Sequence, residues 1–260
     1  MNSDMSSNSK CETNGKSEYC VKQTIKVSII IPVFNEQKTV IEILEKVNRQ
    51  IVSGIEFEVI IVDDCSQDRT AELLVAHPRL YSKLLKMPVN SGKGAAVREG
   101  LRNATGEYIL FQDADLEYDP QDYVSLLHPI VEFSADVVMG SRFLAPPYTR
   151  VAYFWHKMGN KFITFIFNIL NNTTFTDIYT CYLVYRKSLL RADELRTDGW
   201  EQQAEILSLA VSRGRVFYEV PISYYGRSYE EGKKIRAYHS FSVLKALFFT
   251  RFRRRKINRK

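Results

Sequence analysis

Asp113 and Asp115 are two carboxylates, two residues apart, that follow directly after the apolar segment EYILFQ. In an extended segment, residues i and i+2 point to the same side, so both carboxylates are expected to project together beyond the end of a strand. Two close acids repel each other unless a cation lies between them, and their hard oxygen ligands favour Mg²⁺ or Mn²⁺. An isolated Asp-x-Asp is more often a solvated acidic turn, but the position after a buried strand favours a metal site.

Three more polar segments follow apolar runs, as the carboxylate pair does. They are PVFNE at 32–36, VDDCSQD at 62–68 and NSGKGAAVREG at 90–100. Asp63 and Asp64 can accept hydrogen bonds from a base or a ribose, while Lys93 and its neighbouring glycines allow a close approach to phosphate. Each segment alone is also a common helix cap or turn. Neither a Walker A loop nor G-x-G-x-x-G is present, which excludes an ordinary P-loop or Rossmann cofactor site.

The elements that must position these residues alternate between strand and helix patterns. Strand patterns lie at 26–33, 57–63, 84–87 and 107–113, and helix patterns at 39–50, 69–76, 94–104 and 121–133. Further strands are expected at 136–140, 181–186 and 216–222. The runs VSIIIPV and FEVIIVD are continuously apolar, which is typical of a parallel sheet covered on both faces. The sequence therefore predicts an α/β, doubly wound domain with its ligand beyond the carboxyl ends of the strands.

Charge is unevenly distributed along the 260 residues. From Gly232 onward there are eleven Lys or Arg residues and no acid, so subtracting these from the total of +6 leaves residues 1–231 with a net charge of −5. An acidic body with a basic tail indicates an anionic partner surface, either a membrane or a nucleic acid. We disfavour nucleic acid because the tail lacks an interleaved stacking platform.

We expect three parts: a disordered leader at 1–24, a catalytic domain at 25–231 and a basic amphipathic segment at 232–260. The aromatic stretch at 153–170 predicts either a core helix or a helix lying in a lipid interface. The apolar positions of the tail likewise predict either a membrane-facing helix or one that docks on the catalytic domain. No run of about 18 apolar residues and no secretory signal is evident, and the four cysteines are widely spaced. We therefore expect a cytoplasmic protein with reduced thiols, attached peripherally to a membrane.

Seven segments, in this order along the chain, are similar to the sequence motifs of a known protein family. The segments are VSIIIPVFNE, VIIVDDCSQDRT, NSGKGAAVREG, GEYILFQDADLEYDP, DVVMGSRF, TDIYTCYLVYR and VPISYYGRSYEEGKKI. Together they resemble the family 2 glycosyltransferases, and within them the polyprenyl-phosphate and dolichyl-phosphate group. The resemblance runs from Val27 to Ile235 and implies a GT-A fold, a nucleoside-diphosphate sugar donor such as GDP-mannose or a UDP-sugar, and Mg²⁺ or Mn²⁺.

The resemblance also implies roles for individual residues. Those expected to bind the donor are Pro32, Phe34, Glu36, Asp63, Asp64, Lys93, Asp113 and Ala114. Those expected at the metal are Asp113, Asp115 and Glu117, and those expected to clamp the acceptor phosphate are Arg142, Arg227 and Lys233. Asp177 matches an acid close to the reacting sugar. Asp115, Asp177 and Arg142 are the predicted catalytic residues.

Two features depart from the family pattern. In DGWEQQAEI, Gln203 stands where many relatives carry one of two spaced acids, which leaves Glu205 at the other position. Relatives of this group also often carry C-terminal transmembrane helices, in place of which this chain has a short apolar run and a basic cluster. The first departure weakens any assignment of a catalytic base in this stretch.

The predicted function is transfer of a hexose from a nucleoside-diphosphate sugar to a lipid phosphate, with inversion at the anomeric carbon. An alternative is transfer to a hydroxyl of a saccharide or glycolipid. An alcohol must lose its proton to attack, so this alternative requires a base, for which Asp177 and Glu205 are the candidates. A further alternative is a noncatalytic membrane-binding module, against which the intact Asp113 and Asp115 argue.

Overall fold

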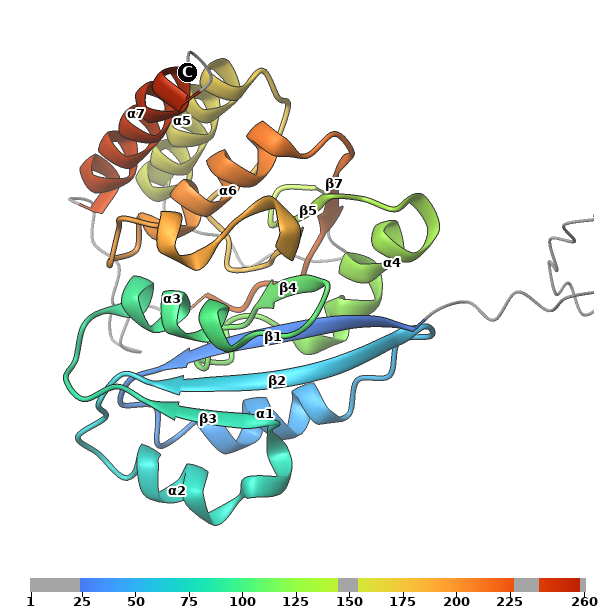
Figure 1. Cartoon of the computed structure of the whole chain (residues 1–260), viewed down its shortest axis with the longest axis vertical. Helices are drawn as coiled ribbons and strands as arrows, with labels where there is room; N and C mark the ends of the chain where they lie inside the picture. Colours follow the sequence, from blue (N-terminus) through green and yellow to red (C-terminus); the bar gives the residue numbers. More distant parts are fainter. Residues whose placement is uncertain (1–23, 145–153, 227–238, 258–260) are drawn as a thin grey trace, which may run out of the picture.

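The computed structural model describes residues 24–144, 154–226 and 239–257 (Figure 1). The strands are β1 (Ile25–Val33), β2 (Ile55–Asp63), β3 (Lys83–Lys86), β4 (Tyr108–Phe111), β5 (Val137–Ser141), β6 (Leu183–Arg186) and β7 (Phe217–Pro221). The α-helices are α1 (Val40–Asn48), α2 (Thr70–Ala76), α3 (Lys93–Asn103), α4 (Tyr123–Phe133), α5 (Phe154–Asn171), α6 (Gln202–Arg213) and α7 (His239–Ile257). The predicted disordered leader and the boundary at residue 232 lie outside the described residues.

The strands form one sheet in the order β3-β2-β1-β4-β6-β5-β7. Pairing is parallel except at β6, which runs antiparallel to both β4 and β5. Helix α3 covers one face of β1 and β2, and α1 and α2 lie on the other face (Figure 1). The predicted doubly wound α/β domain with a mostly parallel sheet is confirmed.

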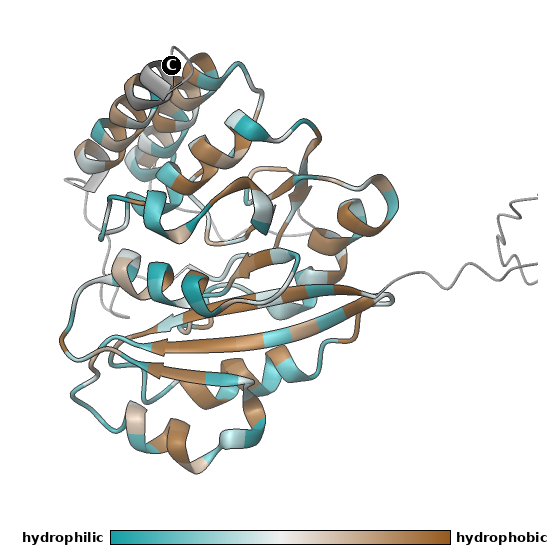
Figure 2. Ribbon diagram, in the orientation of Figure 1, coloured by the Kyte–Doolittle hydropathy of each residue, from teal (hydrophilic) through white to brown (hydrophobic). Residues whose placement is uncertain are grey.

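The central strands are buried on both faces, as their continuous apolar sequences predict. Ile29, Ile30 and Ile31 of β1 are fully buried, as are Ile60 and Ile61 of β2. Successive side chains of a strand point to opposite faces, so neighbouring buried residues require cover on both sides. Figure 2 shows the largely hydrophobic strands β1 and β2 between helices that carry both hydrophilic and hydrophobic residues.

The strand register brings the polar segments of the sequence to one edge of the sheet. Val33 at the end of β1 pairs with Asp63 at the end of β2, and Ile30 pairs with Phe111 at the end of β4. The backbone N–H of Asp64 also donates to the carbonyl oxygen of Val33, at 2.8 Å. The segments that follow β1, β2 and β4 therefore begin beside one another, as expected for a parallel sheet.

Helices α5, α6 and α7 pack together beside the sheet (Figure 1). Helix α7 buries Val243, Ala246 and Leu247, so the C-terminal segment docks on the rest of the protein through one side. Helix α5 likewise buries Ile163 and Phe167 but leaves most of its aromatic residues exposed. In the part of the chain that the structure describes, no helix combines the length and hydropathy needed to cross a membrane.

A buried carboxylate stabilises the edge of the sheet opposite to the polar segments. Glu58 on β2 accepts hydrogen bonds from Ser28 Oγ at 2.6 Å, from the backbone and hydroxyl of Thr105 at 2.8 and 2.9 Å, and from Lys83 Nζ at 3.0 Å. Burial opposes ionisation of this carboxyl group. The hydrogen bonds outweigh burial and lower the pKa of Glu58 from 4.5 to about 2.

This contact predicts how the free energy of unfolding depends on pH. A carboxylate whose pKa is lower in the folded state stabilises the fold above its unfolded pKa, and this contribution disappears as the pH falls from about 4.5 to about 2. Glu58→Gln should therefore cost about 3 kcal/mol near pH 7 and progressively less below pH 4.5. Denaturant unfolding between pH 2.5 and 7 measures the difference, with Glu56→Gln as control, because Glu56 is an exposed residue near the start of the same strand. A pH-independent difference would contradict this account of Glu58.

Candidate active site

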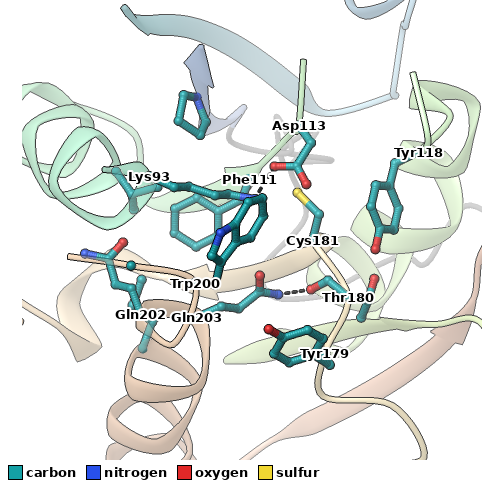
Figure 3. Close-up of a pocket in the computed structure, with 14 residues that line it drawn as sticks. Lys93, Phe111, Asp113, Tyr118, Tyr179, Thr180, Cys181, Trp200, Gln202 and Gln203 are labelled. Atoms are coloured by element: carbon teal, nitrogen blue, oxygen red, sulfur yellow. Dashed lines mark hydrogen bonds and ion pairs between the residues drawn. The ribbon is translucent and has the colours of Figure 1, made fainter. Parts of the chain in front are cut away.

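A pocket opens at the edge of the sheet where the polar segments meet (Figure 3). Its empty space, counted out to the mouth and including open solvent, is about 620 Å³. It is lined by Pro32, Lys93, Val97, Phe111, Asp113, Tyr118, Tyr179, Thr180, Cys181, Gly199, Trp200, Gln202, Gln203 and Ile206. Three predicted donor-binding residues, Pro32, Lys93 and Asp113, therefore come together in one cavity.

The carboxylate pair lies in the loop after β4, as predicted. Asp113 forms an ion pair with Lys93, whose ammonium group also lies 4.8 Å from the centre of the Trp200 ring. Burial opposes the charge on Lys93 and is the largest single effect, but Asp113 and the other anionic groups nearby together outweigh burial and raise the pKa of Lys93 above its ordinary value. Asp115 Oδ1 accepts a hydrogen bond from the backbone N–H of Glu117 at 3.2 Å. Both an anion and a fixed cation therefore face the pocket.

The donor set of this loop fits a divalent cation that shares its ligands with a substrate. Among the described residues, no group of three or more His, Cys, Asp or Glu side chains could enclose a metal ion. Mg²⁺ is commonly held by one or two carboxylates together with substrate phosphates, and Asp113 and Asp115 meet that requirement. The side chain of Glu117 accepts a hydrogen bond from the hydroxyl of Tyr224 at 2.9 Å. Its predicted contact with the metal stays a prediction.

The other predicted donor-binding residues lie at the ends of β1 and β2. The carboxylate of Asp64 accepts backbone hydrogen bonds from Ser91 and Gly92, both at 2.8 Å, and so holds the loop before α3. Asp63 Oδ1 caps the following turn by accepting from the N–H of Ser66 at 3.1 Å. Each of these two aspartates is only 3% exposed.

Three further predicted donor-binding residues complete this edge. Phe34 is half-buried directly after β1. Glu36 Oε2 accepts from the hydroxyl of Thr39 at 3.1 Å. Ala114 is buried between the two aspartates of the carboxylate pair. Contacts of these residues with a nucleoside stay predictions.

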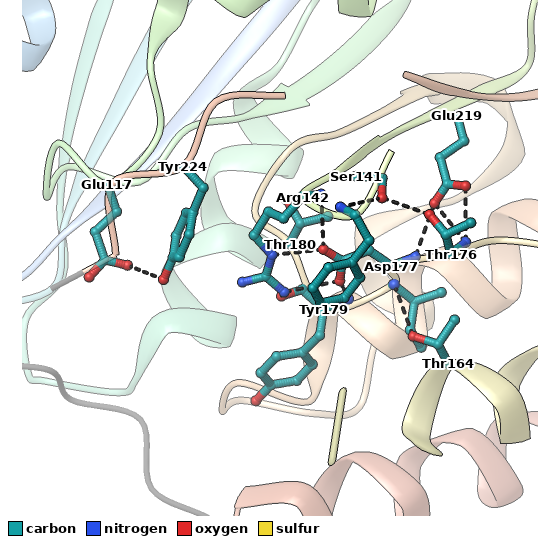
Figure 4. A network of polar contacts seen from close by, with 12 residues as sticks. Glu117, Ser141, Arg142, Thr164, Thr176, Asp177, Tyr179, Thr180, Glu219 and Tyr224 are labelled. Carbon is teal, nitrogen blue, oxygen red and sulfur yellow. Dashed lines mark hydrogen bonds and ion pairs between the residues drawn. The ribbon is translucent and has the colours of Figure 1, made fainter. Parts of the chain in front are cut away.

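Arg142, at the end of β5, is held in a fixed orientation by a network of polar contacts (Figure 4). Its Nε and Nη2 donate to the two carboxylate oxygens of Asp177 at 2.7 and 3.0 Å, and Nη2 also donates to the carbonyl oxygen of Tyr179 at 2.7 Å. Burial opposes the charge of Arg142 and is the largest single effect, but Asp177 and the neighbouring Tyr118 and Tyr224 together outweigh burial and raise the pKa of the guanidinium group. The contacts with Asp177 and Tyr179 use Nε and both N–H groups of Nη2, so the donors that remain to meet a phosphate are those of Nη1.

Asp177 is fully buried, and its described partners are groups that it holds in place. Besides the guanidinium group of Arg142, its carboxylate accepts from the backbone N–H groups of Arg142 and Tyr179, both at 3.2 Å. Beneath it, Glu219 accepts backbone hydrogen bonds from Thr176 at 2.9 Å and from Asp177 at 3.0 Å. Burial raises the pKa of Glu219 above its ordinary value. These contacts make Asp177 a support for Arg142, and its predicted place beside the sugar stays a prediction.

One wall of the pocket comes from the segment DGWEQQAEI, in which the sequence had suggested only Glu205 as a candidate base. The carbonyl oxygen of Asp198 accepts from the N–H of Gly94 at 2.7 Å, and Gln202 Nε2 donates to the carbonyl oxygen of Gly94 at 2.5 Å. A Cβ atom at Gly94 would lie 2.6 Å from the backbone of Asp198, so the approach requires glycine. This packing places Trp200 over Lys93 and brings Gln203 to the pocket.

Glu205, the other acid of this segment, does not line the pocket. It is 3% exposed and accepts hydrogen bonds from the backbone N–H groups of Arg196 and Thr197 at 3.1 and 3.0 Å. It therefore fixes the backbone that precedes the pocket wall. Arg227 and Lys233, the remaining predicted clamp residues, lie outside the described residues.

Three curated relatives have similar sequences. A dolichol-phosphate mannosyltransferase from Pyrococcus furiosus is 27% identical over 85% of this chain, and a dodecaprenyl-phosphate galacturonate synthase from Rhizobium johnstonii is 28% identical over 66%. A dolichyl-phosphate beta-glucosyltransferase, ALG5D, from Trichomonas vaginalis is 32% identical over 50%. The chain spans 64%, 51% and 43% of the lengths of these relatives, respectively.

Solved structures and a family model agree with the fold. A glucosyl-3-phosphoglycerate synthase from Mycobacterium tuberculosis, in complex with Mn²⁺, UDP and glucosyl-3-phosphoglycerate, superposes with a TM-score of 0.62, covering 87% of this chain and 80% of that one at 16% identity. TarS from S. aureus gives a TM-score of 0.56 at 20% identity, covering 88% and 72%. These likenesses confirm the predicted GT-A fold. The model of Glycosyl transferase family 2 matches residues 28–192, more than half of the chain. The chain therefore belongs to the family 2 glycosyltransferases.

Proposed function

We propose that this protein transfers a hexose from a nucleoside-diphosphate sugar to a polyprenyl or dolichyl phosphate. The names of all three curated relatives join a sugar to a phosphate of this lipid class. The observation that carries the proposal is the presence, at one edge of the sheet, of a carboxylate pair and a buried, oriented arginine, Arg142. The first can hold the donor diphosphate through a cation, and the second can hold an acceptor phosphate.

The chemistry requires the protein to bring two anions together. A lipid phosphate is already ionised near neutral pH, so one of its oxygens can attack the anomeric carbon without a general base. The new C–O bond forms as the bond to the nucleoside diphosphate breaks on the opposite face of the sugar, which inverts the configuration. When bound, a divalent cation on Asp113 and Asp115 neutralises charge on the departing diphosphate. Lys93 adds a positive charge on the donor side, and Arg142 orients the acceptor phosphate.

Transfer to a hydroxyl acceptor is less compatible with the described residues. That reaction needs a carboxylate free to take a proton near the sugar. Of the described residues that line the pocket, Asp113 is the one carboxylate, and it is paired with Lys93. Asp177 is committed to Arg142, and Glu205 to the backbone.

Incubation of the purified protein with labelled GDP-mannose or UDP-sugars, Mn²⁺ and a polyprenyl phosphate tests the proposal. The expected product is a lipid-linked sugar phosphodiester that mild acid hydrolyses. The donor that supports its formation identifies the nucleotide and the sugar. Transfer to a saccharide or glycolipid with no phosphodiester formed would instead support the hydroxyl acceptor.

We further propose that α5 and α7 together form a membrane-facing surface at the cytoplasmic face of a membrane. The two helices pack against each other, and large apolar side chains remain exposed on both. Those on α5 are Phe154, Trp155, Met158, Phe162, Phe165 and Ile169, and those on α7 are Phe241, Phe248, Phe249 and Phe252. Aromatic side chains flanked by Lys and Arg are typical of helices that lie in a lipid interface. Each such cation adds about 1 kcal/mol of attraction to an anionic leaflet.

This surface begins beside the proposed acceptor clamp. Lys157 of α5 lies 5.5 Å from the centre of the Phe143 ring, and Phe143 directly follows Arg142. The guanidinium group of Arg142 is 5.9 Å from the same ring. A lipid whose phosphate reached Arg142 would therefore have its chain next to the exposed aromatic residues of α5.

Replacing Phe248, Phe249 and Phe252 together by serine should lower binding to vesicles of phosphatidylcholine and phosphatidylglycerol at least about tenfold, because three apolar groups lose their burial in lipid. Transfer to a long-chain acceptor in the vesicles should fall in parallel, while transfer to a short, water-soluble polyprenyl phosphate should persist. Co-sedimentation and initial rates measure the two effects. Deleting the helix would be a poor test because Val243 and Leu247 are buried.

A matched control replaces three exposed apolar residues elsewhere by serine: Ile51, Val75 and Val124. This control should bind vesicles as the parent does. Unchanged binding of the phenylalanine variant would remove α7 from the membrane surface and leave α5 as the remaining candidate.

A further inference from the structure

Two segments that each leave the sheet run side by side next to the pocket. The loop after β4 carries the carboxylate pair and continues to Glu117 and Tyr118, and the segment after β7 carries Tyr224 and Tyr225. Tyr118 and Tyr224 form an antiparallel β-bridge, and the N–H of Tyr225 donates to the carbonyl oxygen of Glu117 at 2.9 Å. The hydroxyl of Tyr224 donates to Glu117 Oε2 at 2.9 Å (Figure 4).

The loop after β4 is in a conformation that its neighbours must maintain. Leu116, between Asp115 and Glu117, has a φ of +62°, in the left-handed region. This conformation costs a residue with a Cβ atom about 1–2 kcal/mol and persists where surrounding contacts enforce it. The contacts of Tyr224 and Tyr225 with Glu117 are of that kind. They fix Glu117, whose N–H in turn bonds Asp115 Oδ1 at 3.2 Å.

The ring of Tyr224 contacts the other half of the site. Its centre lies 5.0 Å from the guanidinium carbon of Arg142 and 5.1 Å from the centre of the Tyr118 ring. A cation over an aromatic face is attracted by the ring quadrupole. One side chain thus meets the carboxylate loop through its hydroxyl group and Arg142 through its ring.

We propose that Tyr224 is a positioning residue that joins the carboxylate loop to Arg142 and so sets the placement of the donor diphosphate relative to the acceptor phosphate. The inference rests on the proposed function for the identity of those two anions. It assigns separate effects to the two parts of the side chain. The hydroxyl group maintains the loop that holds the donor, and the ring maintains the orientation of the acceptor clamp.

Tyr224→Phe removes the hydroxyl group and keeps the ring. In the ligand-free protein, amide hydrogen exchange of a peptide spanning residues 113–118 should become faster. The Mn²⁺-dependent affinity for the nucleotide sugar, measured by calorimetry, should fall about tenfold, because a hydrogen bond to a charged group is lost from a strained loop. The KM for the acceptor should stay within about twofold of the parent, whereas Tyr224→Leu should raise it about tenfold.

Tyr218→Phe is the matched control, because Tyr218 on the neighbouring strand β7 stacks on Phe133, away from the loop after β4. It should change none of these quantities. A double variant adds a readout that general destabilisation would not give: in a Glu117→Ala background, Tyr224→Phe should cause no further loss of nucleotide affinity.

Two results would overturn the inference. One is amide hydrogen exchange of residues 113–118 in Tyr224→Phe at the rate of the parent protein. The other is a loss of nucleotide affinity in the double variant that equals the sum of the losses in the single variants. Because hydrogen exchange needs no ligand, it decides the role of Tyr224 separately from the proposed function. The latter fails if the parental protein binds no nucleotide sugar in the presence of Mn²⁺.

Discussion

Asp115→Asn should reduce the rate of sugar transfer about a thousandfold, with the fold intact. Asparagine keeps the size of the side chain, and its Oδ1 can still accept the hydrogen bond from the N–H of Glu117 that Asp115 accepts at 3.2 Å. The substitution removes the negative charge with which Asp115, together with Asp113, would bind a divalent cation. Loss of electrostatic stabilisation at a developing charge typically costs about 2.7–4 kcal/mol, or 10²–10³ in rate.

Initial rates at saturating Mn²⁺ measure the loss, and calorimetric titration of the nucleotide sugar with and without Mn²⁺ shows whether the metal-dependent part of binding has gone. Asp193→Asn is a suitable control because Asp193 forms an exposed pair with Arg191, and such pairs contribute little. Its thermal unfolding and its rate should match the parent. An Asp115→Asn protein that transfers sugar at the parental rate would show that the carboxylate pair does not serve the donor.

Arg142→Lys should lower kcat/KM for the lipid phosphate about a hundredfold while changing the affinity for the nucleotide sugar much less. Lysine keeps the charge but has a single nitrogen, so it cannot bond both oxygens of Asp177 in the same way and still offer a separate donor, such as Nη1, to a phosphate. The buried Asp177 would then lose one of its charged hydrogen bonds. Varying acceptor and donor separately in rate measurements distinguishes the two effects.

A second arginine provides the matched control for this substitution. Arg186 also pairs with an aspartate, Asp136, at 3.1 Å and lies 4.8 Å from the ring centre of Tyr108, but it stands at the opposite edge of the sheet. Arg186→Lys should therefore affect the free energy of unfolding without affecting the acceptor KM. An equal loss of donor affinity in Arg142→Lys would place Arg142 at the nucleotide instead.

The sequence predicted those parts of the site that depend on local geometry. Asp113 and Asp115 are two residues apart after an apolar strand, and the order of strands in a parallel sheet places the segments after β1, β2 and β4 together. Trp200 was not predicted to take part because its place depends on packing between residues far apart in the chain, such as the contact of Gln202 with Gly94. No local pattern encodes such a contact.

The apolar residues of α5 and α7 show a second limit of sequence patterns. Burial against protein and burial in lipid both favour apolar side chains, so the sequence left a docked helix and a membrane-facing helix as alternatives. The structure shows that α7 docks through Val243 and Leu247 while Phe248 and Phe249 stay exposed. Helix α7 therefore carries both buried residues that dock on the protein and exposed apolar residues. From the sequence alone, docking and membrane contact were treated as mutually exclusive.

The close contact between α3 and the pocket wall determines which residues of the site tolerate substitution. Gly92 has a φ of +92°, and a Cβ atom there or at Gly94 would lie 2.8 or 2.6 Å from the backbone of Asp198. The wall is therefore packed closely against α3, which leaves its backbone little room to adapt to a differently shaped sugar. Trp200 and Gln203 line the pocket from this wall. In directed evolution towards a new donor, we expect changes in preference to accumulate at positions 200 and 203, while libraries that vary positions 92 and 94 yield mainly misfolded protein.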